Sequence, residues 1–303
     1  MIVYIIDNLR KIYKFGLFFL YMEKRGWVGG RGIIAVDLGG TNLRISLVRR
    51  GKILEYKRML TPKTKEALIK EMFGHISEFM DKEGKNIYGI GIASPGPLKN
   101  GVIINPENIP LKNYDLKEAV RKKFGVKAEV ENDANCVALA EAELGVKKKN
   151  FFVLTLGTGV GGGVIIDGKL LGKSSCGAEL GHIYLTPEKD FEELVGAKAI
   201  NRMAQKAFGK NILISDLVKM NNSKSRDILE SISEYLGQGI GSLINVFNPE
   251  ITVLAGGMRH AGEGFLNRIK EKTKKYIMLP GKFEIAWTKL EHPGTLGASL
   301  LLD

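Results

Sequence analysis

The stretch IIAVDLGGTNLRISLV occupies residues 33–48 and sets the predicted fold. Its apolar residues predict a strand over 33–37 and a second strand over 44–48, joined by a tight turn that contains two glycines. A turn at Arg50-Gly51 leads to a third strand over 52–60, and apolar residues at helical spacing then predict a helix over 65–82. This part of the chain is therefore predicted to be a hairpin meander followed by a helix.

The same plan returns in FFVLTLGTGVGGGVII, residues 151–166. Strands are predicted over 151–156 and 160–166, again around a glycine-rich turn, and Asp167-Gly168 marks the next turn. This repetition at low sequence similarity predicts an α/β protein with two related lobes. Each lobe would open with an antiparallel hairpin whose tight turn faces a shared cleft.

The remaining pattern fits two such lobes. Further strands and helices are predicted at 88–93, 116–124, 126–130, 136–144, 200–208, 225–247, 251–255 and 294–302. We expect residues 33–130 to form a small lobe, completed by a C-terminal helix at 290–303, and residues 131–289 to form a large lobe. Residues 1–32 would be an N-terminal extension.

The composition is that of an ordinary globular protein. The chain has 303 residues, of which 44% are hydrophobic and 26% are charged, and its formal net charge is +12. A basic balance suits nucleic acid, but it equally suits a polyanionic nucleotide substrate, so it does not choose between them. Cys136 and Cys176 form no C-x-x-C pair, which argues against a disulfide framework and favours the reducing cytoplasm.

The N-terminus contains two short apolar runs, residues 1–6 and 15–21. Charged residues separate these runs before the length needed to cross a membrane is reached. The positive charges follow the first apolar run, which is the reverse of their order in a secretory signal. We therefore expect a peripheral helix or a true start at Met22, and no stable membrane association.

The candidate catalytic residue is Asp133, within Glu131-Asn132-Asp133-Ala134-Asn135. This segment joins a predicted strand to a predicted helix. A carboxylate held on such a rigid junction, between two amides, suits the removal of a proton from an alcohol while a phosphoryl group arrives from the other side. Glycine-rich turns lie upstream and downstream of it. A base together with two phosphate cradles indicates a kinase.

The upstream turn has the residue types of a phosphate site. Gly39 and Gly40 remove side chains so that backbone N–H groups can approach a phosphate, and Thr41 and Asn42 add hydroxyl and amide donors. Asp37, at the end of the strand, would point at the metal ion that accompanies the nucleotide. The same pattern also occurs in purely structural hairpins, and that alternative stays open for this turn alone.

The downstream turn contains Gly157-x-Gly159-x-x-Gly162, which formally satisfies the dinucleotide fingerprint. That fingerprint must open a helix, whereas residues 164–170 continue as a strand and a turn. The glycines therefore form a hairpin cradle, and the chain contains no Walker P-loop. A structural glycine hairpin remains the alternative.

Farther on, GAELGH at 177–182 places Glu179 and His182 in a loop, where they would help Asn132 and Asp133 to bind the hydroxyls of a polyol.

Several of these motifs, in this order, resemble the ROK family (repressor, open reading frame, kinase) of the actin-like ATPase superfamily. The resemblance spans about residues 33–302 and rests on the segments 37–42, 89–97, 108–110, 131–135, 155–163, 177–182 and 254–257. It implies a two-lobed, ribonuclease H-like fold with a duplicated mixed-sheet domain and a central cleft. It also implies an ATP- and Mg²⁺-dependent kinase that phosphorylates the 6-hydroxyl of glucose or a related hexose.

The resemblance assigns roles to individual residues. Asp133 would be the general base, and the ring hydroxyls would be bound by Asn108, Asn132, Glu179, His182 and Glu192, with Glu193 as the alternative to Glu192. The nucleotide phosphates would lie between Gly39, Gly40, Thr41 and Asn42 on one side and Gly157, Thr158 and Gly159 on the other. Gly256 and Gly257 would lie beneath the adenosine, and Asp37 would hold Mg²⁺ through water.

Two departures from the family pattern stand out. Asn42 replaces a lysine that many members have after Gly-Gly-Thr, and Arg44 is a candidate to restore the lost charge. The family's zinc site uses the histidine of the G-x-x-G-H segment and a run of cysteines, but residues 183–192 contain no cysteine. We predict no structural zinc. Packing of Tyr184, Leu185, Phe191 and Leu194 would hold the loop instead.

Other functions remain as alternatives. An N-acetylglucosamine or N-acetylmannosamine kinase is second to a glucose kinase, because the residues suit several hexoses. A sugar-responsive repressor needs a DNA-reading module ahead of the sugar domain, and only about 32 residues precede the first predicted strand, so we expect no nucleic-acid partner. A non-catalytic sugar-binding protein would not need Asp133 beside phosphate turns. A homodimer is the default assembly.

Overall fold

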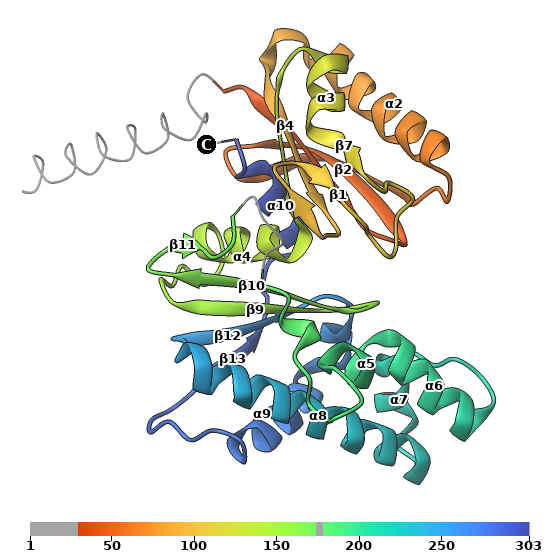
Figure 1. Cartoon of the computed structure of the whole chain (residues 1–303), viewed down its shortest axis with the longest axis vertical. Coiled ribbons are helices and arrows are strands. Elements are labelled where there is room, and N and C mark those ends of the chain that lie inside the picture. The colour runs from red at the N-terminus through yellow and green to blue at the C-terminus, as the bar shows by residue number, and fades with distance from the viewer. Residues whose placement is uncertain (1–29, 174–177, 303) are drawn as a thin grey trace, which may run out of the picture. The chain divides into compact units, whose positions relative to one another are not determined.

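The computed structural model describes residues 30–173 and 178–302 (Figure 1). Residues 1–29 of the predicted N-terminal extension, together with Cys176 and Gly177, lie outside this range, and Gly32 already belongs to the first strand. The described chain forms two compact units. The first contains the residues up to Asp133 together with those from Gly294 onward, and the second runs from Ala134 to Pro293. Each unit is built around its own five-stranded sheet.

The first sheet contains the predicted hairpin meander. Its strands are β1 (Gly32–Leu38), β2 (Asn42–Arg49), β3 (Lys52–Leu60), β4 (Ile87–Ser94) and β8 (Lys127–Asn132), in the order β3-β2-β1-β4-β8. Strands β1, β2 and β3 are antiparallel neighbours, whereas β4 and β8 continue the sheet parallel to β1. A separate three-stranded sheet is formed by β5 (Leu98–Lys99), β6 (Val102–Ile103) and β7 (Tyr114–Asp115).

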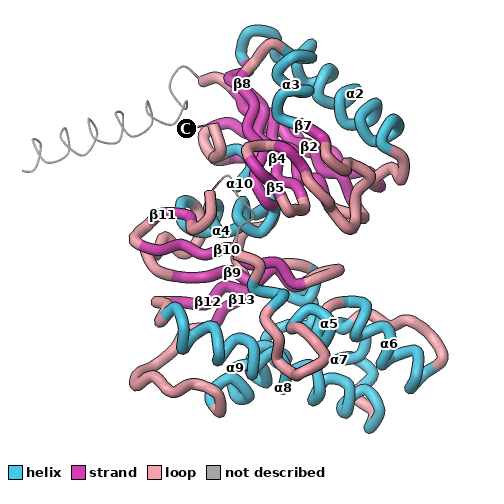
Figure 2. The backbone as a smooth tube through the Cα atoms, viewed as in Figure 1, coloured by secondary structure: helices cyan, strands magenta, loops and turns pink. Residues whose placement is uncertain are grey.

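The second sheet repeats this plan (Figure 2). Its strands are β9 (Phe151–Leu156), β10 (Val160–Ile166), β11 (Lys169–Leu170), β12 (Ile251–Ala255) and β13 (Ile285–Trp287), in the order β11-β10-β9-β12-β13. An antiparallel hairpin is again extended by two parallel strands. The predicted duplication of a mixed-sheet α/β domain is therefore confirmed.

The helices of the first unit are α2 (Lys65–Glu83), α3 (Leu116–Phe124) and α10 (Pro293–Ser299), with a 3₁₀ turn η1 (Gly84–Asn86) after α2. Helix α2 begins where the Thr64 hydroxyl accepts a hydrogen bond from the Ala67 N–H. Its buried residues recur at helical spacing and face the sheet: Leu68, Met72, Ile76 and Phe79. The pattern of apolar residues at this spacing explains why the helix was predictable.

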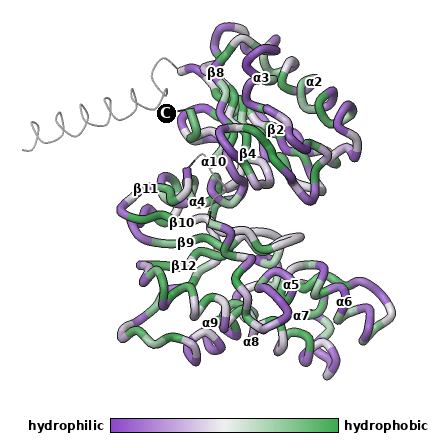
Figure 3. Tube along the Cα trace, viewed as in Figure 1, coloured by the Kyte–Doolittle hydropathy of each residue, from purple (hydrophilic) through white to green (hydrophobic). Residues whose placement is uncertain are grey.

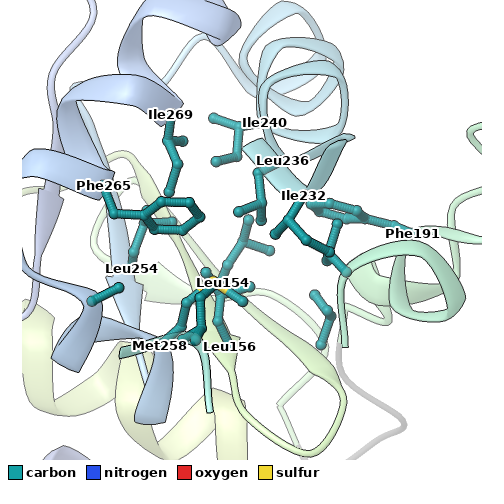
Figure 4. Close-up of a cluster of buried hydrophobic side chains, with 14 of the residues drawn as sticks. Leu154, Leu156, Phe191, Ile232, Leu236, Ile240, Leu254, Met258, Phe265 and Ile269 are labelled. Atoms are coloured by element: carbon teal, nitrogen blue, oxygen red, sulfur yellow. The ribbon is translucent and has the colours of Figure 1, made fainter. Parts of the chain in front are cut away.

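The second unit holds α4 (Asp133–Glu143), α5 (Phe191–Val195), α6 (Ala197–Phe208), α7 (Ile214–Met220), α8 (Ser223–Phe247) and α9 (Gly262–Lys274), with 3₁₀ turns η2 (Leu180–His182) and η3 (Gly257–Ala261). Figure 3 shows the hydropathy of each residue along the chain trace. Apolar side chains from α8, α9 and α5 meet those of β9 and β12 in one core (Figure 4). Phe191, the first residue of α5, is fully buried in it. The sequence analysis did not predict α5, α7, α9 or β13. Of these, α5, α7 and β13 are short, whereas α9 has 13 residues and buries apolar residues at helical spacing.

Two helices belong to a different unit from the strand that precedes each of them in the chain. Helix α4 follows β8 yet packs on β10, where a Cβ at Gly163 would lie 2.5 Å from the Ala134 carbonyl oxygen. Helix α10 follows β13 yet packs on β4, where a Cβ at Gly91 would lie 1.9 Å from the Ala298 carbonyl oxygen. Glycine on each strand therefore allows the backbone of a helix to approach the sheet closely.

Candidate active site

The first unit gathers several candidate residues at one edge of its sheet. Strands β1, β4 and β8 are parallel, so their carboxyl ends meet at this edge. Asp37 is paired with Ala93, and Ala93 is paired with Glu131. Asp37 therefore lies in the same row as the start of the Glu131–Asn135 segment. The edge at the carboxyl ends of parallel strands is the usual place for ligands in α/β proteins.

Asp133 lies at the predicted junction between a strand and a helix. It is the first residue of α4 and directly follows the last residue of β8, Asn132. Glu131 and Asn132 are buried, and the Asn132 N–H donates to Glu131 Oε1 at 2.8 Å, whereas Asp133 is only partly buried. The junction is thus anchored on its strand side, next to a carboxylate that solvent can still reach.

The first glycine turn brings Asn108 beside the candidate phosphate loop. The Gly39 N–H donates to the Asn42 carbonyl at 2.9 Å, and Thr61 Oγ1 donates to the Gly39 carbonyl at 2.6 Å. A Cβ at Gly40 would lie 2.6 Å from Asn108 Cβ. Glycine at position 40 is therefore required for Asn108 to pack against the turn, which joins a predicted sugar ligand to a predicted phosphate loop.

Cations surround this turn, although position 42 carries no charge. Arg44 Nη1 donates to Asp37 Oδ2 at 2.8 Å, so Arg44 is paired with the predicted metal-binding carboxylate. Lys63 Nζ donates to the Gly40 carbonyl at 3.1 Å, and Arg58 Nε donates to Asn42 Oδ1 at 3.0 Å. Neither Lys63 nor Arg58 was predicted from the sequence. The pairing of β2 with β3 places Arg58 here, and Lys63 follows shortly after the end of β3.

The second glycine turn carries the carboxylate of Glu192. The Gly157 N–H donates to the Gly159 carbonyl at 3.0 Å, which closes the turn. Glu192 Oε2 accepts a hydrogen bond from the Val160 N–H at 2.8 Å, and a Cβ at Gly159 would lie 2.1 Å from the same oxygen. Because residue 159 has no side chain, the Glu192 carboxylate can occupy the space beside the turn.

Glu193, the alternative to Glu192, has a different task. Its side chain accepts a hydrogen bond from the Asp190 N–H at 3.1 Å, and Asp190 Oδ1 accepts from the Glu193 N–H at 2.8 Å. This reciprocal pair is a capping box at the start of α5. Glu193 is therefore occupied in holding the helix, while Glu192 lies against the glycine turn.

Gly256 and Gly257 lie at the same edge as this turn. Strand β12 is parallel to β9, and Ala255 is paired with Thr155. Gly256 has a φ of 92°, and a Cβ there would lie 2.5 Å from the Leu156 carbonyl oxygen. Both the backbone conformation and the close approach of the two chains require glycine at this position. The structure thus brings the predicted adenosine loop next to the Gly157–Gly159 turn.

Glu179 and His182 flank the same region of the second unit. Burial raises the pKa of the Glu179 carboxyl, and the nearby charge of Glu192 adds to this effect, although His182 opposes it. His182 Nδ1 lies 2.8 Å from Asp190 Oδ2, and this contact raises the pKa of the imidazole. Asp190 is a further candidate that the sequence analysis missed, because a helix N-cap residue gives no separate sign of a second role.

The loop after His182 differs in part from the prediction. Phe191 and Leu194 are buried as expected, but Tyr184 is 70% exposed and does not pack into the core. Backbone contacts hold the loop instead, because Tyr184 forms a bridge with Asp190 and the Phe191 N–H donates to the Ile183 carbonyl at 2.8 Å. The pattern of apolar residues could not show that Tyr184 sits on the outer side of this short hairpin.

Two comparisons place the chain among known proteins. The ROK family model matches residues 33–303. The chain belongs to the ROK family. The glucokinase of Thermotoga maritima is 32% identical to it over 89% of this chain and 96% of the glucokinase.

Two further relatives extend the comparison. A ROK hexokinase from Thermus thermophilus has a TM-score of 0.77 at 28% identity, over 89% of this chain and 97% of the hexokinase. The xylose repressor of Caldicellulosiruptor bescii is 27% identical over 79% of this chain and 69% of the repressor. The fold is thus the actin-like ATPase fold of the ROK kinases. In the described part of the chain, every helix is too short or too polar to cross a bilayer.

Proposed function

We infer that this ROK protein is a hexose kinase that transfers the γ-phosphoryl group of ATP to the 6-hydroxyl of glucose or a related hexose. The observation that carries this inference is the placement of Asp133 at the end of β8, at the sheet edge that also holds the first glycine turn and Asp37. A base and a phosphate loop at one edge are what phosphoryl transfer to an alcohol requires. Membership of the ROK family supports the same conclusion.

Five polar side chains would bind the sugar in this proposal. Asn108 and Asn132 in the first unit, and Glu179, His182 and Glu192 in the second, would bind the hydroxyls of the sugar. Amide, carboxylate and imidazole groups together supply the donors and acceptors that a polyol needs. The position of Glu192 on the Val160 N–H, and the use of Glu193 in the capping box, favour Glu192 as the sugar ligand.

The nucleotide would use backbone N–H groups and small side chains. Gly39, Gly40, Thr41 and Asn42 would bind phosphate on one turn, and Gly157, Thr158 and Gly159 on the other, with Gly256 and Gly257 beneath the adenosine. Main-chain donors in glycine turns suit phosphate oxygens because no side chain blocks their approach. Lys63 and Arg58 would supply the positive charge that Asn42 lacks.

In the chemical step, the 6-hydroxyl oxygen forms a bond to the γ-phosphorus while the bond from this phosphorus to the oxygen bridging to the β-phosphate breaks. The hydroxyl proton passes to the Asp133 carboxylate. Proton removal by a positioned carboxylate contributes about 10²- to 10⁴-fold to the rate. Alignment of the two substrates supplies much of the remainder.

Magnesium fits the residues that are present. Mg²⁺ is normally held by one or two carboxylates together with substrate phosphates and water, and not by a cage of protein ligands. Asp37 offers one such carboxylate, and within residues 30–173 and 178–302 no group of three or more acidic, histidine or cysteine side chains could hold a metal ion. Bound Mg²⁺ would neutralise charge on the phosphates, with Asp37 contacting it through water.

Glucose is our first choice of substrate, and N-acetylglucosamine and N-acetylmannosamine are the alternatives. The same side chains suit all three sugars, which differ at position 2. We further propose that the protein works in the cytoplasm, where ATP is available, and that it forms a homodimer.

A coupled assay of the full-length protein with six hexoses tests the proposal. ATP, ADP and polyphosphate serve as donors, with and without Mg²⁺. We expect turnover with glucose, ATP and Mg²⁺. A protein that turns over none of the six sugars with any donor would overturn the proposal. Because the family also includes repressors, a gel-shift assay with promoter and random DNA is the parallel control.

A further inference from the structure

Asp190 holds His182 from one side of its ring. Asp190 Oδ2 lies 2.8 Å from His182 Nδ1, and the side chains are 13% and 51% exposed, respectively. This contact leaves Nε2 without a hydrogen-bond partner among residues 30–173 and 178–302. Because a carboxylate is an acceptor, Nδ1 carries the proton and Nε2 is the atom presented to a ligand.

Asp190 is itself fixed by three sets of contacts. Its other carboxylate oxygen, Oδ1, accepts the N-cap hydrogen bond from the Glu193 N–H at 2.8 Å. Its backbone pairs with Tyr184 across the hairpin. The next residue, Phe191, is fully buried and packs so closely against α8 that a Cβ at Gly239 would lie 2.6 Å from its ring. Asp190 is therefore a rigid anchor for the imidazole.

The surroundings of His182 are acidic. Besides Asp190, the carboxylates of Glu179 and Glu192 are close enough to influence the ring electrostatically. These are the two glutamates proposed to bind the sugar. An imidazole that was free to rotate could turn toward any of the three carboxylates. Its contact with Asp190 selects one orientation, in which the ring stays beside Glu179 and Glu192.

A zinc ion does not fit this place. A structural zinc site uses four ligands, usually cysteine and histidine. Here the residues beside His182 Nδ1 offer one carboxylate, both of whose oxygens already accept hydrogen bonds, and the loop from 183 to 192 contains no cysteine. The described part of the chain holds no group of three potential metal ligands anywhere.

We propose that Asp190 is a positioning residue that takes the place of a structural metal ion at His182, fixing the imidazole so that Nε2 faces the bound hexose. The proposal rests on the hexose-kinase function inferred above. The carboxylate joins two structural duties, capping α5 and orienting His182. A loop of nine residues, 183–191, therefore does without a metal ion.

Three variants separate the two duties. Asp190→Ser keeps a good N-cap residue for α5 but is too short to reach His182. Asp190→Asn keeps the N-cap through its one amide oxygen but turns an N–H donor toward His182 Nδ1, and His182→Ala removes the ring. Glu193→Gln is the matched control, because it alters the same capping box without touching His182.

We expect Asp190→Ser to fold and to raise the KM for the hexose roughly three- to tenfold, the effect of one lost hydrogen bond, with a smaller change in the KM for ATP. Asp190→Asn should not restore this loss, because its amide N–H opposes a protonated Nδ1, and Glu193→Gln should leave the hexose KM near the wild-type value. Combining Asp190→Ser with His182→Ala should add nothing to His182→Ala alone, because both act through the same ring.

Two readouts do not depend on turnover. The ¹⁵N NMR spectrum of the His182 ring should show a protonated Nδ1 in the wild type and lose this signature in Asp190→Ser. Mass spectrometry should find zinc well below one atom per chain, and activity should return fully when Mg²⁺ is restored after chelation. A hexose KM unchanged in Asp190→Ser, an unchanged ring spectrum, or one zinc per chain would overturn the proposal. A wild type without kinase activity would overturn the function instead, and the ring spectrum would still decide whether Asp190 fixes His182.

Discussion

The Glu192 carboxylate accepts a hydrogen bond from the Val160 N–H at 2.8 Å, in space that exists only because residue 159 is glycine. The contact ties α5, which begins at Phe191, to the turn between β9 and β10. A proposed sugar ligand and a proposed phosphate loop are therefore one structural unit. Disturbing the turn should disturb sugar binding as well as nucleotide binding.

The variant Gly159→Ala tests this connection. The new Cβ would lie 2.1 Å from Glu192 Oε2, so the carboxylate must move. We expect kcat/KM for the hexose to fall on the order of 10²-fold, the effect of displacing a positioning group by about 1 Å. Steady-state kinetics, in which the concentration of each substrate is varied in turn, measure kcat/KM. The matched control is Gly157→Ala, whose Cβ meets nothing within 4 Å and should leave the hexose KM unchanged. Equal effects of the two variants on the hexose KM would contradict the assignment of Glu192.

Replacement of Asp133 by asparagine tests the base. Asparagine keeps the size of the side chain but cannot accept the proton, so kcat should fall about 10²- to 10⁴-fold while the hexose still binds. Coupled assays give the rate, and calorimetric titration gives the affinity for the sugar. Near-normal turnover of Asp133→Asn would rule out this residue as the base.

The variants Lys63→Ala and Arg58→Ala test the charge at the first turn. Both cations contact the turn, through the Gly40 carbonyl and Asn42 Oδ1, and we expect each variant to raise the KM for ATP about three- to tenfold. The hexose KM should change less. Lys65→Ala is the matched control, because Lys65 Nζ lies over the Tyr114 ring, 4.5 Å from its centroid. If all three variants behave alike, the effect comes from net charge and not from the turn.

Gly91→Ala tests the packing of α10 on β4. Its Cβ would lie 1.9 Å from the Ala298 carbonyl oxygen, and backbone atoms on both sides leave little room for adjustment. We expect the free energy of unfolding to fall by about 1–3 kcal/mol. The control Gly74→Ala, in the exposed middle of α2 with nothing within 4 Å, should raise this free energy by about 0.5–1 kcal/mol. Urea denaturation compares them, and equal stability of the two variants would contradict the close packing.

Glu141 gives a pH dependence of stability. It is buried, and burial raises the pKa of its carboxyl above the ordinary value, against the opposing hydrogen bonds from Thr288 and the Val146 N–H. A raised pKa means that the folded state holds the proton more tightly than the unfolded state. The stabilising contribution of Glu141 to the free energy of unfolding is therefore present below pH 4.5. It is lost as the pH rises through the pKa of the folded state.

Glu141→Gln removes this titration. The free energy of unfolding of the wild type, relative to the variant, should decrease between about pH 4 and pH 7, as measured by urea denaturation across that range. The control is Glu188→Gln, which changes an exposed loop residue and should follow the wild type. A constant difference between wild type and Glu141→Gln at every pH would show that the carboxyl does not titrate differently on folding.

Local patterns in the chain were enough to predict both hairpins, the two longest helices, α2 and α8, and the junction at Asp133. Alternating apolar residues, glycine turns and helical spacing act over a few neighbouring residues, so the strand limits at 52–60 and 151–156 and the helix at 116–124 were confirmed as predicted. The repeated hairpin also indicated the duplicated sheet, because the same pattern folds the same way twice.

Contacts between distant segments could not be read in this way. The place of Asn108 against Gly40, of Glu192 on the Val160 N–H and of Asp190 at His182 depends on sheet register and on core packing around Phe191. The same applies to Lys63 and Arg58 near the first turn, and to Tyr184, which an apolar pattern placed inside but which lies outside. Many pairings across the chain are compatible with one local pattern, and the packing of the folded core selects among them.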